Sequence, residues 1–460
     1  MRHLAISSAL IAVMLAMPAA AEKRDGWYRQ GDFSPVKRIA IRISNPGDDD
    51  RIEAPVTLTP EQLPEIRGAQ PFTVTLVDPA LPPQPALTPR QRAIAGPHGL
   101  REEEGGHAIF YQLDDLDKDG LWDELFFMTD IAAHETKTLY LYLGFQQRGW
   151  NPHRTNAAIG SYMRHVVPFW ESENVGWKLW FPTDIDIYAK REPVLMSNRL
   201  LTENLDGYAV SYADPAYGSD IMSVDSSFGG GGIGLFETPG SDALSRPRFT
   251  PHSDLEHRFN GNGLKDTRYA FDVVVNGPLR SIVRIKTMNW NTGHGHYDLT
   301  QTYTAYAGKN YSTAKVHFDR FEPENPGAAL AVGIRKRPGS TMNFREDGVV
   351  VTAGTEVIRN PDDTESDQNA LKVAYAGTAL VVSSAYTPDY VYDPDQGENH
   401  VFRLRPGPDG DYEYLIAAGW SEGATLKTAD AFKQYVLDVA RERDNPVRLI
   451  DAYTETRPAD

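Results

Sequence analysis

An aspartate-rich segment, residues 115–124, has the residue types of a calcium-binding loop. Four aspartates occupy positions 1, 3, 5 and 9 of the loop, namely Asp115, Asp117, Asp119 and Asp123, and Gly120 occupies position 6. Carboxylates at alternate positions can converge on one hard cation, and glycine permits the sharp turn. An EF-hand would have Glu at position 12 and flanking helices, whereas this chain has Phe126 and strand-like flanks. The segment therefore predicts a β-hairpin turn, either with a structural Ca²⁺ or as a metal-free turn of ordinary turn residues.

Two histidines, His294 and His296, are the strongest candidates for proton transfer. Glycines separate and flank them, and in an extended chain their side chains point to the same side. Histidine acts as a base or an acid near neutral pH. Two other interpretations stay open: a pair of solvated loop histidines, or a two-histidine metal pair whose third ligand the sequence does not identify.

Basic residues follow one face of a predicted strand over residues 281–287. Arg280, Arg284 and Lys286 alternate with Val283 and Ile285, which belong to the opposite face. We call these three residues the basic stripe. Paired N–H groups of arginine suit a carboxylate or a sulfate. The alternative is a strand face that simply points to solvent.

A third group of polar residues lies between positions 165 and 190. If residues 184–190 form a strand, Asp184, Asp186 and Tyr188 share one face and Lys190 follows on it. Tyr188 and Lys190 are an acid–base candidate, because a nearby cation lowers the pKa of a phenol. Glu171 has a second glutamate two residues on, and such a pair indicates a glycoside hydrolase or an edge strand with surface acids.

The elements that must position these residues are mostly strands. Strict alternation predicts strands over residues 38–44, 136–144, 271–275, 281–287, 297–306 and 312–318. One helix is predicted over 429–443, with Thr428 as its N-cap and Asn445-Pro446 closing it. We expect a mainly β protein with an N-terminal β module (22–150) and a large antiparallel β-sandwich body (151–460) that carries the helix.

Composition limits the location and the partners. Residues 1–21 have the features of a cleaved secretory signal, with Arg2, an apolar run and a small-residue site ending at Ala21, so we expect a periplasmic or secreted protein without membrane insertion. The chain has no cysteine, so core packing must supply its stability. A formal net charge of −17 argues against nucleic acid as a partner. No protein partner is evident.

Several segments together resemble a bacterial family long filed as a domain of unknown function, one member of which is described as an ulvan oligosaccharide dehydratase. The matching segments, in order, are 43–46 (Ile-Ser-Asn-Pro), 115–124 running into Leu-Phe-Phe, 169–173 (Phe-Trp-Glu-Ser-Glu), 176–190, 217–220 (Tyr-Gly-Ser-Asp) and 226–233. The resemblance implies a supersandwich of the mutarotase and polysaccharide-lyase kind and the removal of water from a non-reducing-end uronic acid. It implies an anionic oligosaccharide substrate, and we expect no organic cofactor.

That chemistry needs a base, an acid and cationic groups for the substrate carboxylate. We expect the acid–base set to include His294, His296, Tyr188 and Lys190. We expect the sugar to contact the basic stripe and Arg164, His165, Trp170, Glu171 and Trp290, with flat rings stacking on pyranose faces. Three other functions stay open: a chain-cleaving polysaccharide lyase, a glycoside hydrolase, and a non-catalytic carbohydrate-binding protein.

Overall fold

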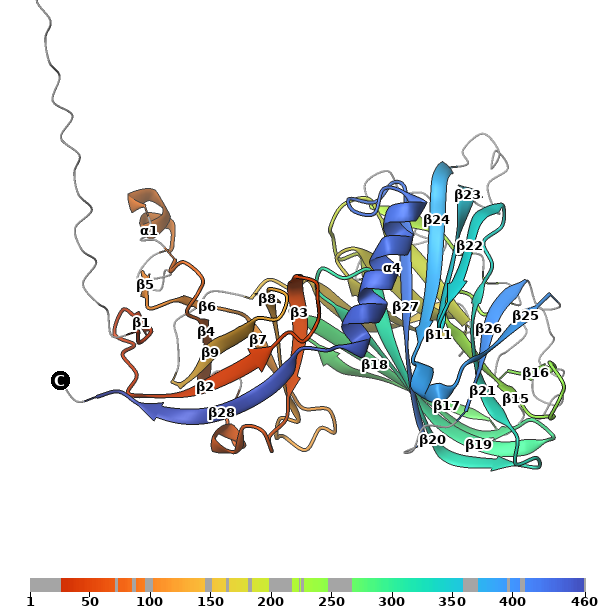
Figure 1. The fold of residues 1–460 in the computed structure, drawn as a ribbon, viewed down its shortest axis with the longest axis horizontal. Helices are drawn as coiled ribbons and strands as arrows, with labels where there is room; N and C mark the ends of the chain where they lie inside the picture. Colours follow the sequence, from red (N-terminus) through yellow and green to blue (C-terminus); the bar gives the residue numbers. More distant parts are fainter. Residues whose placement is uncertain are drawn as a thin grey trace, which may run out of the picture.

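The computed structural model describes residues 26–70, 73–84, 88–95, 102–144, 151–162, 165–180, 184–197, 217–222, 224, 227–246, 267–358, 371–394, 398–405 and 410–458. The predicted signal segment lies outside these residues. The fold is mainly β and antiparallel, with one long helix near the C-terminus, which confirms the predicted fold class. Figure 1 shows two modules side by side, an N-terminal one and a larger main body.

The N-terminal module is a small sandwich of two sheets. The first sheet has the order β28 (Arg448–Thr456), β2 (Lys37–Ser44), β9 (Thr136–Leu143), β4 (Val74–Asp78) and β6 (His107–Ala108). The second has the order β3 (Arg51–Leu58), β8 (Glu124–Ile131) and β7 (Tyr111–Asp114). A short pair, β1 (Arg29–Gln30) with β5 (Glu103–Glu104), and the helices η1 (Pro64–Ile66) and α1 (Pro89–Ala95) complete it. Alternate residues of both sheets, such as Ile41, Leu141 and Phe127, fill the core between them.

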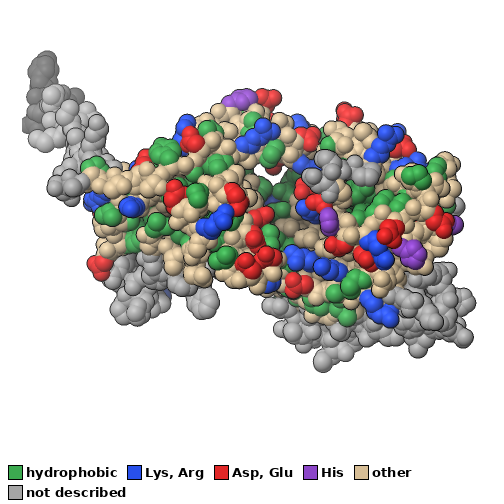
Figure 2. Space-filling model, turned by 90° about the horizontal axis from the view of Figure 1, so that it is seen from below, with side chains coloured by type: hydrophobic (Ala, Val, Ile, Leu, Met, Phe, Trp, Pro, Cys, Tyr) green, Lys and Arg blue, Asp and Glu red, His purple; other side chains and the backbone are tan. Residues whose placement is uncertain are grey.

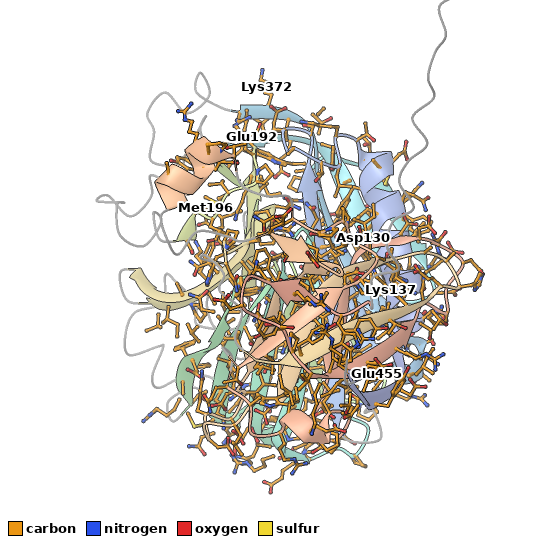
Figure 3. All side chains as sticks on the ribbon, turned by 90° about the vertical axis from the view of Figure 1, so that its left-hand side faces the viewer. Asp130, Lys137, Glu192, Met196, Lys372 and Glu455 are labelled. Atoms are coloured by element: carbon orange, nitrogen blue, oxygen red, sulfur yellow. The ribbon has the colours of Figure 1, made fainter. Side chains whose placement is uncertain are left out.

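A buried ion pair and the last strand of the chain also belong to this module. The Lys137 ammonium lies 2.6 Å from the Asp78 carboxylate and donates to the backbone oxygen of Asp130 at 2.8 Å (Figure 3). Strand β28 pairs antiparallel with β2, so the chain returns from the main body to close the N-terminal sheet. The domain boundaries predicted from the sequence place residues 448–456 in the main body. Local alternation predicts a strand but does not reveal its distant partner.

The main body is a sandwich whose two layers enclose the largest core. One layer is the eight-stranded sheet β17 (Arg268–Asn276), β18 (Arg280–Asn291), β19 (Gly295–Tyr306), β20 (Tyr311–Pro323), β27 (Asp411–Trp420), β24 (Leu371–Val382), β23 (Val349–Ile358) and β22 (Ser340–Glu346). Two five-stranded sheets form the facing layer. The first is β10 (Thr155–Tyr162), β11 (His165–Ser172), β12 (Val175–Trp180), β13 (Asp184–Lys190) and β14 (Gly218–Asp220). The second is β16 (Leu244–Ser245), β15 (Gly232–Phe236), β21 (Ala329–Arg335), β26 (Asn399–Leu404) and β25 (Asp389–Asp393).

A bridge between Ile185 and Gly229 connects the two five-stranded sheets. Gly229 has φ +59°, and a Cβ there would lie 2.4 Å from the Ile185 carbonyl oxygen, so only glycine fits. Gly229 therefore allows a close approach between the two backbones.

Helix α4 (Ala429–Asp444) covers the outer face of the eight-stranded sheet. The Thr428 hydroxyl accepts a hydrogen bond from the Ala431 amide, which confirms the predicted N-cap. Phe432, Val436 and Val439 are buried against apolar residues of β23, β24 and β27. The short helix η4 (Ser384–Tyr386) precedes β25.

Buried polar contacts join the two modules at the β7–β8 hairpin. The Arg280 guanidinium lies 2.6 Å from the carboxylates of both Asp114 and Glu124. The Gln112 side-chain oxygen accepts from the amides of Leu279 and Arg280 at 2.6 and 2.7 Å. A second link is the Arg154 guanidinium, which pairs with Glu53 of the N-terminal module.

Candidate functional site

The basic stripe does not line an open basic groove. Arg280 is buried, and two carboxylates of the N-terminal module neutralise its charge. Arg284 donates to the backbone oxygen of Leu116 at 3.0 Å, and Lys286 is exposed. The sequence showed the stripe but not the neighbouring module that covers part of it. Where Figure 2 shows the described surface, Lys and Arg side chains alternate with Asp and Glu and form no continuous basic area.

His294 and His296 lie at the turn between β18 and β19, and both are exposed. The His294 Nδ1 atom lies 3.7 Å from the Glu324 carboxylate, with both side chains more than half exposed. The structure does not bring either histidine into the group around Tyr188 described below. Their proposed role in proton transfer stays a prediction.

Glu171 and Lys190 form a buried ion pair in which every polar group has a partner. The Lys190 ammonium contacts the Glu171 carboxylate and donates to the backbone oxygens of Ser172 and Val194 at 2.6 and 2.7 Å. Glu171 also accepts from the amides of Met196 and Ser197. Both side chains are fully buried, and burial lowers the pKa of Lys190. This arrangement fixes strands β11 and β13 to the segment that follows β13 and leaves no group for a substrate.

The two tryptophans expected to stack on a sugar are core residues. Trp170 is 0% exposed and stacks on Tyr303 with a ring-centroid distance of 4.6 Å, and Trp290 is 2% exposed. Neither ring presents a face to a ligand in this structure. Arg164 and the side chain of His165 lie outside the described part of the chain.

The aspartate-rich segment is a hairpin turn between β7 and β8, as predicted. Asp115, Asp117 and Asp123 each place a carboxylate oxygen within 4.8 Å of the others. Asp119 is not part of this group, and its carboxylate accepts from the Leu121 amide at 2.7 Å. The turn also packs on the main body, because Leu116 contacts Val274, Val275 and Ile282. Three carboxylates at this spacing suit Ca²⁺, which prefers oxygen ligands.

A different polar group lies on the outer face of strands β12, β13 and β14, and we call it the Lys178 cluster. Its members are Lys178, Asp186, Tyr188 and Asp220. Trp177 and Ile187 point into the main core, so the alternation of the strands turns Lys178, Asp186 and Tyr188 to the opposite face. Asp220 is the cross-strand partner of Tyr188.

Lys178 is at the centre of this cluster. Its ammonium lies 2.9 Å from the Asp186 carboxylate and donates to the Tyr188 hydroxyl oxygen at 2.8 Å. The Asp220 carboxylate accepts from the Met222 amide at 2.9 Å. The side chains of Lys178 and Asp186 are 15% and 8% exposed, and Asp220 is half-buried. The cluster is therefore accessible to solvent.

The cluster has two carboxyl groups but only one ammonium, and this imbalance perturbs their protonation. Burial and the neighbouring Asp186 charge raise the pKa of Asp220 well above its usual range. Burial also raises the pKa of Asp186, although Lys178 opposes this effect. For Lys178, burial acts to lower the pKa, but Asp186, Tyr188 and Asp220 outweigh it. Of the two carboxyl groups, Asp220 therefore has the stronger tendency to keep its proton, because Lys178 pairs with Asp186.

Tyr188 differs from the expectation for a tyrosine beside a lysine. Its partner is Lys178, not Lys190, and it is 1% exposed. Burial raises the pKa of Tyr188 by more than the Lys178 charge lowers it. Tyr188 is thus a neutral phenol and not a phenolate base.

Two arginines border the cluster. Arg246 pairs with Asp184, which is the next residue of β13 on the same face. Arg337 is 2% exposed, contacts the backbone oxygen of Ile221 and lies 3.1 Å from the Glu356 carboxylate. Its positive charge acts on Asp220, but burial has the larger effect on that pKa.

Sequence reasoning assigned no role to Lys178 or Asp220, although both lie in the segments that carry the resemblance. Lys178 stands alone between Trp177 and Leu179, and an isolated lysine in an apolar strand is a signal for a buried charge. Asp220 has no comparable signal, because its strand has three residues and its partner Tyr188 is 32 positions away.

The chain belongs to a protein family. The profile of that family, "Domain of unknown function (DUF4861)", matches residues 100–449. This range contains the whole Lys178 cluster and the aspartate-rich turn. No curated protein matches the chain in sequence.

Solved structures with a similar arrangement include an alpha-mannosidase from Enterococcus faecalis V583, with 11% identity and a TM-score of 0.47. Another is a protein in the glycosyl hydrolase family 38 from Enterococcus faecalis, with 11% identity and a TM-score of 0.46. They cover 93% and 92% of this chain, but the chain covers only 47% and 48% of theirs. Nothing about the activity of this chain follows at this level of similarity. Separately, no described helix is long and apolar enough to cross a membrane.

Proposed function

We propose that this chain is an exported carbohydrate-active lyase, an oligosaccharide dehydratase that removes water from the non-reducing-end uronic acid of an ulvan-like anionic oligosaccharide. The observation that carries the proposal is the Lys178 cluster, in which one ammonium pairs with a carboxylate and a phenol while a second carboxyl group lies on the neighbouring strand, and both carboxyl groups have raised pKa values. Perturbed titratable groups gathered on one face favour an acid–base site over simple binding. The substrate class rests on the family resemblance, and export rests on the signal predicted over residues 1–21.

The reaction breaks the C5–H and C4–O bonds and forms the C4–C5 double bond. Asp186 is the candidate base, because a carboxylate with a raised pKa binds a proton more strongly. Asp220 is the candidate acid that protonates the C4 hydroxyl as it leaves as water. A proton then returns from Asp186 to Asp220, which restores the starting state.

Lys178 is the candidate for stabilising negative charge, and Tyr188 holds its ammonium in position through the 2.8 Å hydrogen bond. Removal of the C5 proton moves charge onto the substrate carboxylate, so a cation or a hydrogen-bond donor beside it lowers the barrier. Lys178 keeps its positive charge chiefly because the Asp186 carboxylate lies 2.9 Å from its ammonium. Tyr188 stays a neutral phenol because it is buried.

Two carboxyl groups of unlike protonation also support a second candidate, a glycoside hydrolase with Asp220 as acid and Asp186 as base or nucleophile. A chain-cleaving lyase would use the same groups as the dehydratase and expel a sugar in place of water.

Product analysis separates these activities. The full chain is incubated with uronic-acid oligosaccharides, followed by ultraviolet absorbance of the new double bond and by mass spectrometry. A dehydratase gives new absorbance and the loss of one water without shortening. Shortening with new absorbance would identify a chain-cleaving lyase, and shortening without it a hydrolase. No change over a panel of uronic-acid substrates would overturn the enzymatic proposal.

A further inference from the structure

A cavity of about 730 Å³ lies in the main body, away from the strands that carry the Lys178 cluster. It is bordered by the β22–β23 turn, by β24, by the segment from η4 to β25, and by the last turn of α4. Its volume is within the range of cavities that bind small molecules, ~300–1,000 Å³. The Gly348 backbone in the turn has φ +81°, and a Cβ there would lie 2.4 Å from the Val382 carbonyl oxygen. The turn is therefore held close to the neighbouring strand.

Two arginines in this cavity have unused hydrogen-bonding groups. The Arg345 guanidinium lies over the ring of Tyr390 at 4.0 Å and is exposed. Arg443 donates from Nη2 to the backbone oxygen of Glu413 at 2.9 Å, while its Nε is buried without a hydrogen-bond partner. Neither arginine forms an ion pair with a carboxylate within the described chain. Arginine donors that lack a protein carboxylate are suited to a carboxylate or sulfate of a ligand.

Tyr390, which lines the cavity beside Arg345, forms a hydrogen bond with His400. The Tyr390 hydroxyl lies 2.7 Å from His400 Nδ1, so the ring that supports Arg345 has a fixed orientation. Burial lowers the pKa of His400 to about 4, with Lys336 and Arg345 adding to the effect. His400 is therefore neutral at pH 7 and adds no charge to the cavity. A wall fixed before binding reduces the entropy cost of association.

Three acidic residues, Glu346, Asp347 and Asp444, also line the cavity. Their carboxylates can accept hydrogen bonds from hydroxyl groups, which a simple anion does not offer. A ligand with both an acidic group and several hydroxyls matches this mixture of arginines and carboxylates. A simple inorganic anion matches only the arginines, because it has no hydroxyl groups to donate to the three carboxylates.

We infer that this cavity is a non-catalytic binding site for an acidic sugar residue of an oligosaccharide. Binding at this cavity keeps a long oligosaccharide on the protein surface while the terminal sugar residue reacts at a separate site. The sugar class of the probe rests on the proposed function, but the site itself rests on the arginines, the acids and the cavity.

Calorimetric titration of the full chain tests this site. The probe is a glucuronic-acid tetrasaccharide, with cellotetraose as the neutral probe, and the Asp220→Asn background keeps the acidic probe intact. Arg345→Ala with Arg443→Gln is expected to weaken binding of the acidic probe at this site at least about tenfold, the effect of losing one charged hydrogen bond. Arg448→Ala, at an exposed arginine of β28 outside the cavity, is the matched control and leaves binding unchanged.

Equal affinity for the acidic probe with and without the two arginines would overturn the inference, and so would equal loss for both probes. Turnover of a uronic-acid disaccharide, measured with native Asp220, keeps the two proposals apart. If the arginine variant loses tetrasaccharide binding and no protein turns over the disaccharide, the cavity site stands and the dehydratase fails. If turnover occurs and binding does not depend on the arginines, the dehydratase stands and the cavity site fails.

Discussion

Two buried lysines, Lys178 and Lys190, show how charge balance separates a structural group from a candidate catalytic one. Lys190 faces one carboxylate and two backbone oxygens, so each of the three N–H groups of its ammonium has an acceptor. Lys178 faces one carboxylate, one phenol and the field of a second carboxyl group. Burial and the Asp186 charge raise the pKa of Asp220 well above its usual range, and a carboxylic acid that stays protonated at neutral pH can act as an acid catalyst.

Replacement of Lys190 tests the structural assignment. Lys190→Met leaves Glu171 buried without its partner, so we expect the free energy of unfolding to fall by about 3–5 kcal/mol. Denaturant unfolding measures the change. Lys315→Met is the control, because it removes a half-exposed ion pair with Asp411. It is expected to lower the free energy of unfolding by no more than about 1 kcal/mol. A Lys190→Met protein of native stability that has lost its activity would instead give Lys190 a catalytic role.

Asp220 should destabilise the folded protein at neutral pH. The pKa of Asp220 is higher in the folded state than in the unfolded state. Its contribution to the free energy of unfolding is therefore fully present below the unfolded-state pKa and is lost as pH rises through the folded-state pKa. Asp220→Asn cannot ionise, so we expect the variant to melt at a higher temperature than the native protein at pH 8. This difference should shrink as pH falls to about 4, the usual pKa of an aspartate. Parallel melting curves from pH 4 to 8 would contradict the protonation scheme.

At the scale of elements, strands and the helix followed from local pattern, while contacts between elements did not. Alternation predicted β2, β9 and β18 because one face of each strand is buried. The stripe on β18 was also visible, but its partners Asp114 and Glu124 come from another module. Asp220 and Tyr188 meet across strands that no short-range pattern aligns. The candidate site was therefore only partly predictable. Asp186 and Tyr188 follow from their shared face and Lys178 from its isolation in an apolar strand, whereas Asp220 follows only from the fold.

The β7–β8 turn provides a test of the structural calcium prediction. If Asp115, Asp117 and Asp123 bind Ca²⁺, its addition raises the melting temperature and chelation lowers it, without a selective loss of turnover. Asp117→Asn should remove the calcium-dependent rise. Asp119→Asn is the matched control, because the Asp119 carboxylate lies outside the group. Unchanged melting of the native protein with Ca²⁺ and with chelator would make this a metal-free turn.

At the scale of the whole molecule, the C-terminal strand β28 connects the main body to the N-terminal module. Strand β28 follows α4 and becomes an edge strand of the N-terminal module (Figure 1). There the Glu455 carboxylate lies 2.6 Å from the Arg38 guanidinium. Glu455, Arg38 and the β2–β28 backbone pairing join segments more than 400 residues apart. The N-terminal sheet is therefore complete only while β28 is paired with β2.

Deletion of residues 448–460 tests this connection. Loss of β28 exposes the backbone of β2, and an unpaired edge strand promotes association between molecules. We expect earlier proteolysis within residues 26–144 and aggregation on heating, whereas the main body stays resistant. Ile450→Ser, at a side chain that is 46% exposed, keeps the strand pairing and should behave like the native protein. Equal protease resistance of the truncated and native proteins would refute the role of β28.

The most direct test of the account compares turnover of a uronic-acid oligosaccharide by Asp186→Asn, Asp220→Asn and His294→Ala/His296→Ala proteins whose folding is verified by circular dichroism. Loss of an acid or a base typically slows a reaction about 10²–10⁴-fold. The account predicts a loss of this size for each aspartate variant and less than about tenfold for the histidine variant. Native turnover by the aspartate variants, with loss in the histidine variant, would place the chemistry at the β18–β19 turn and contradict the account.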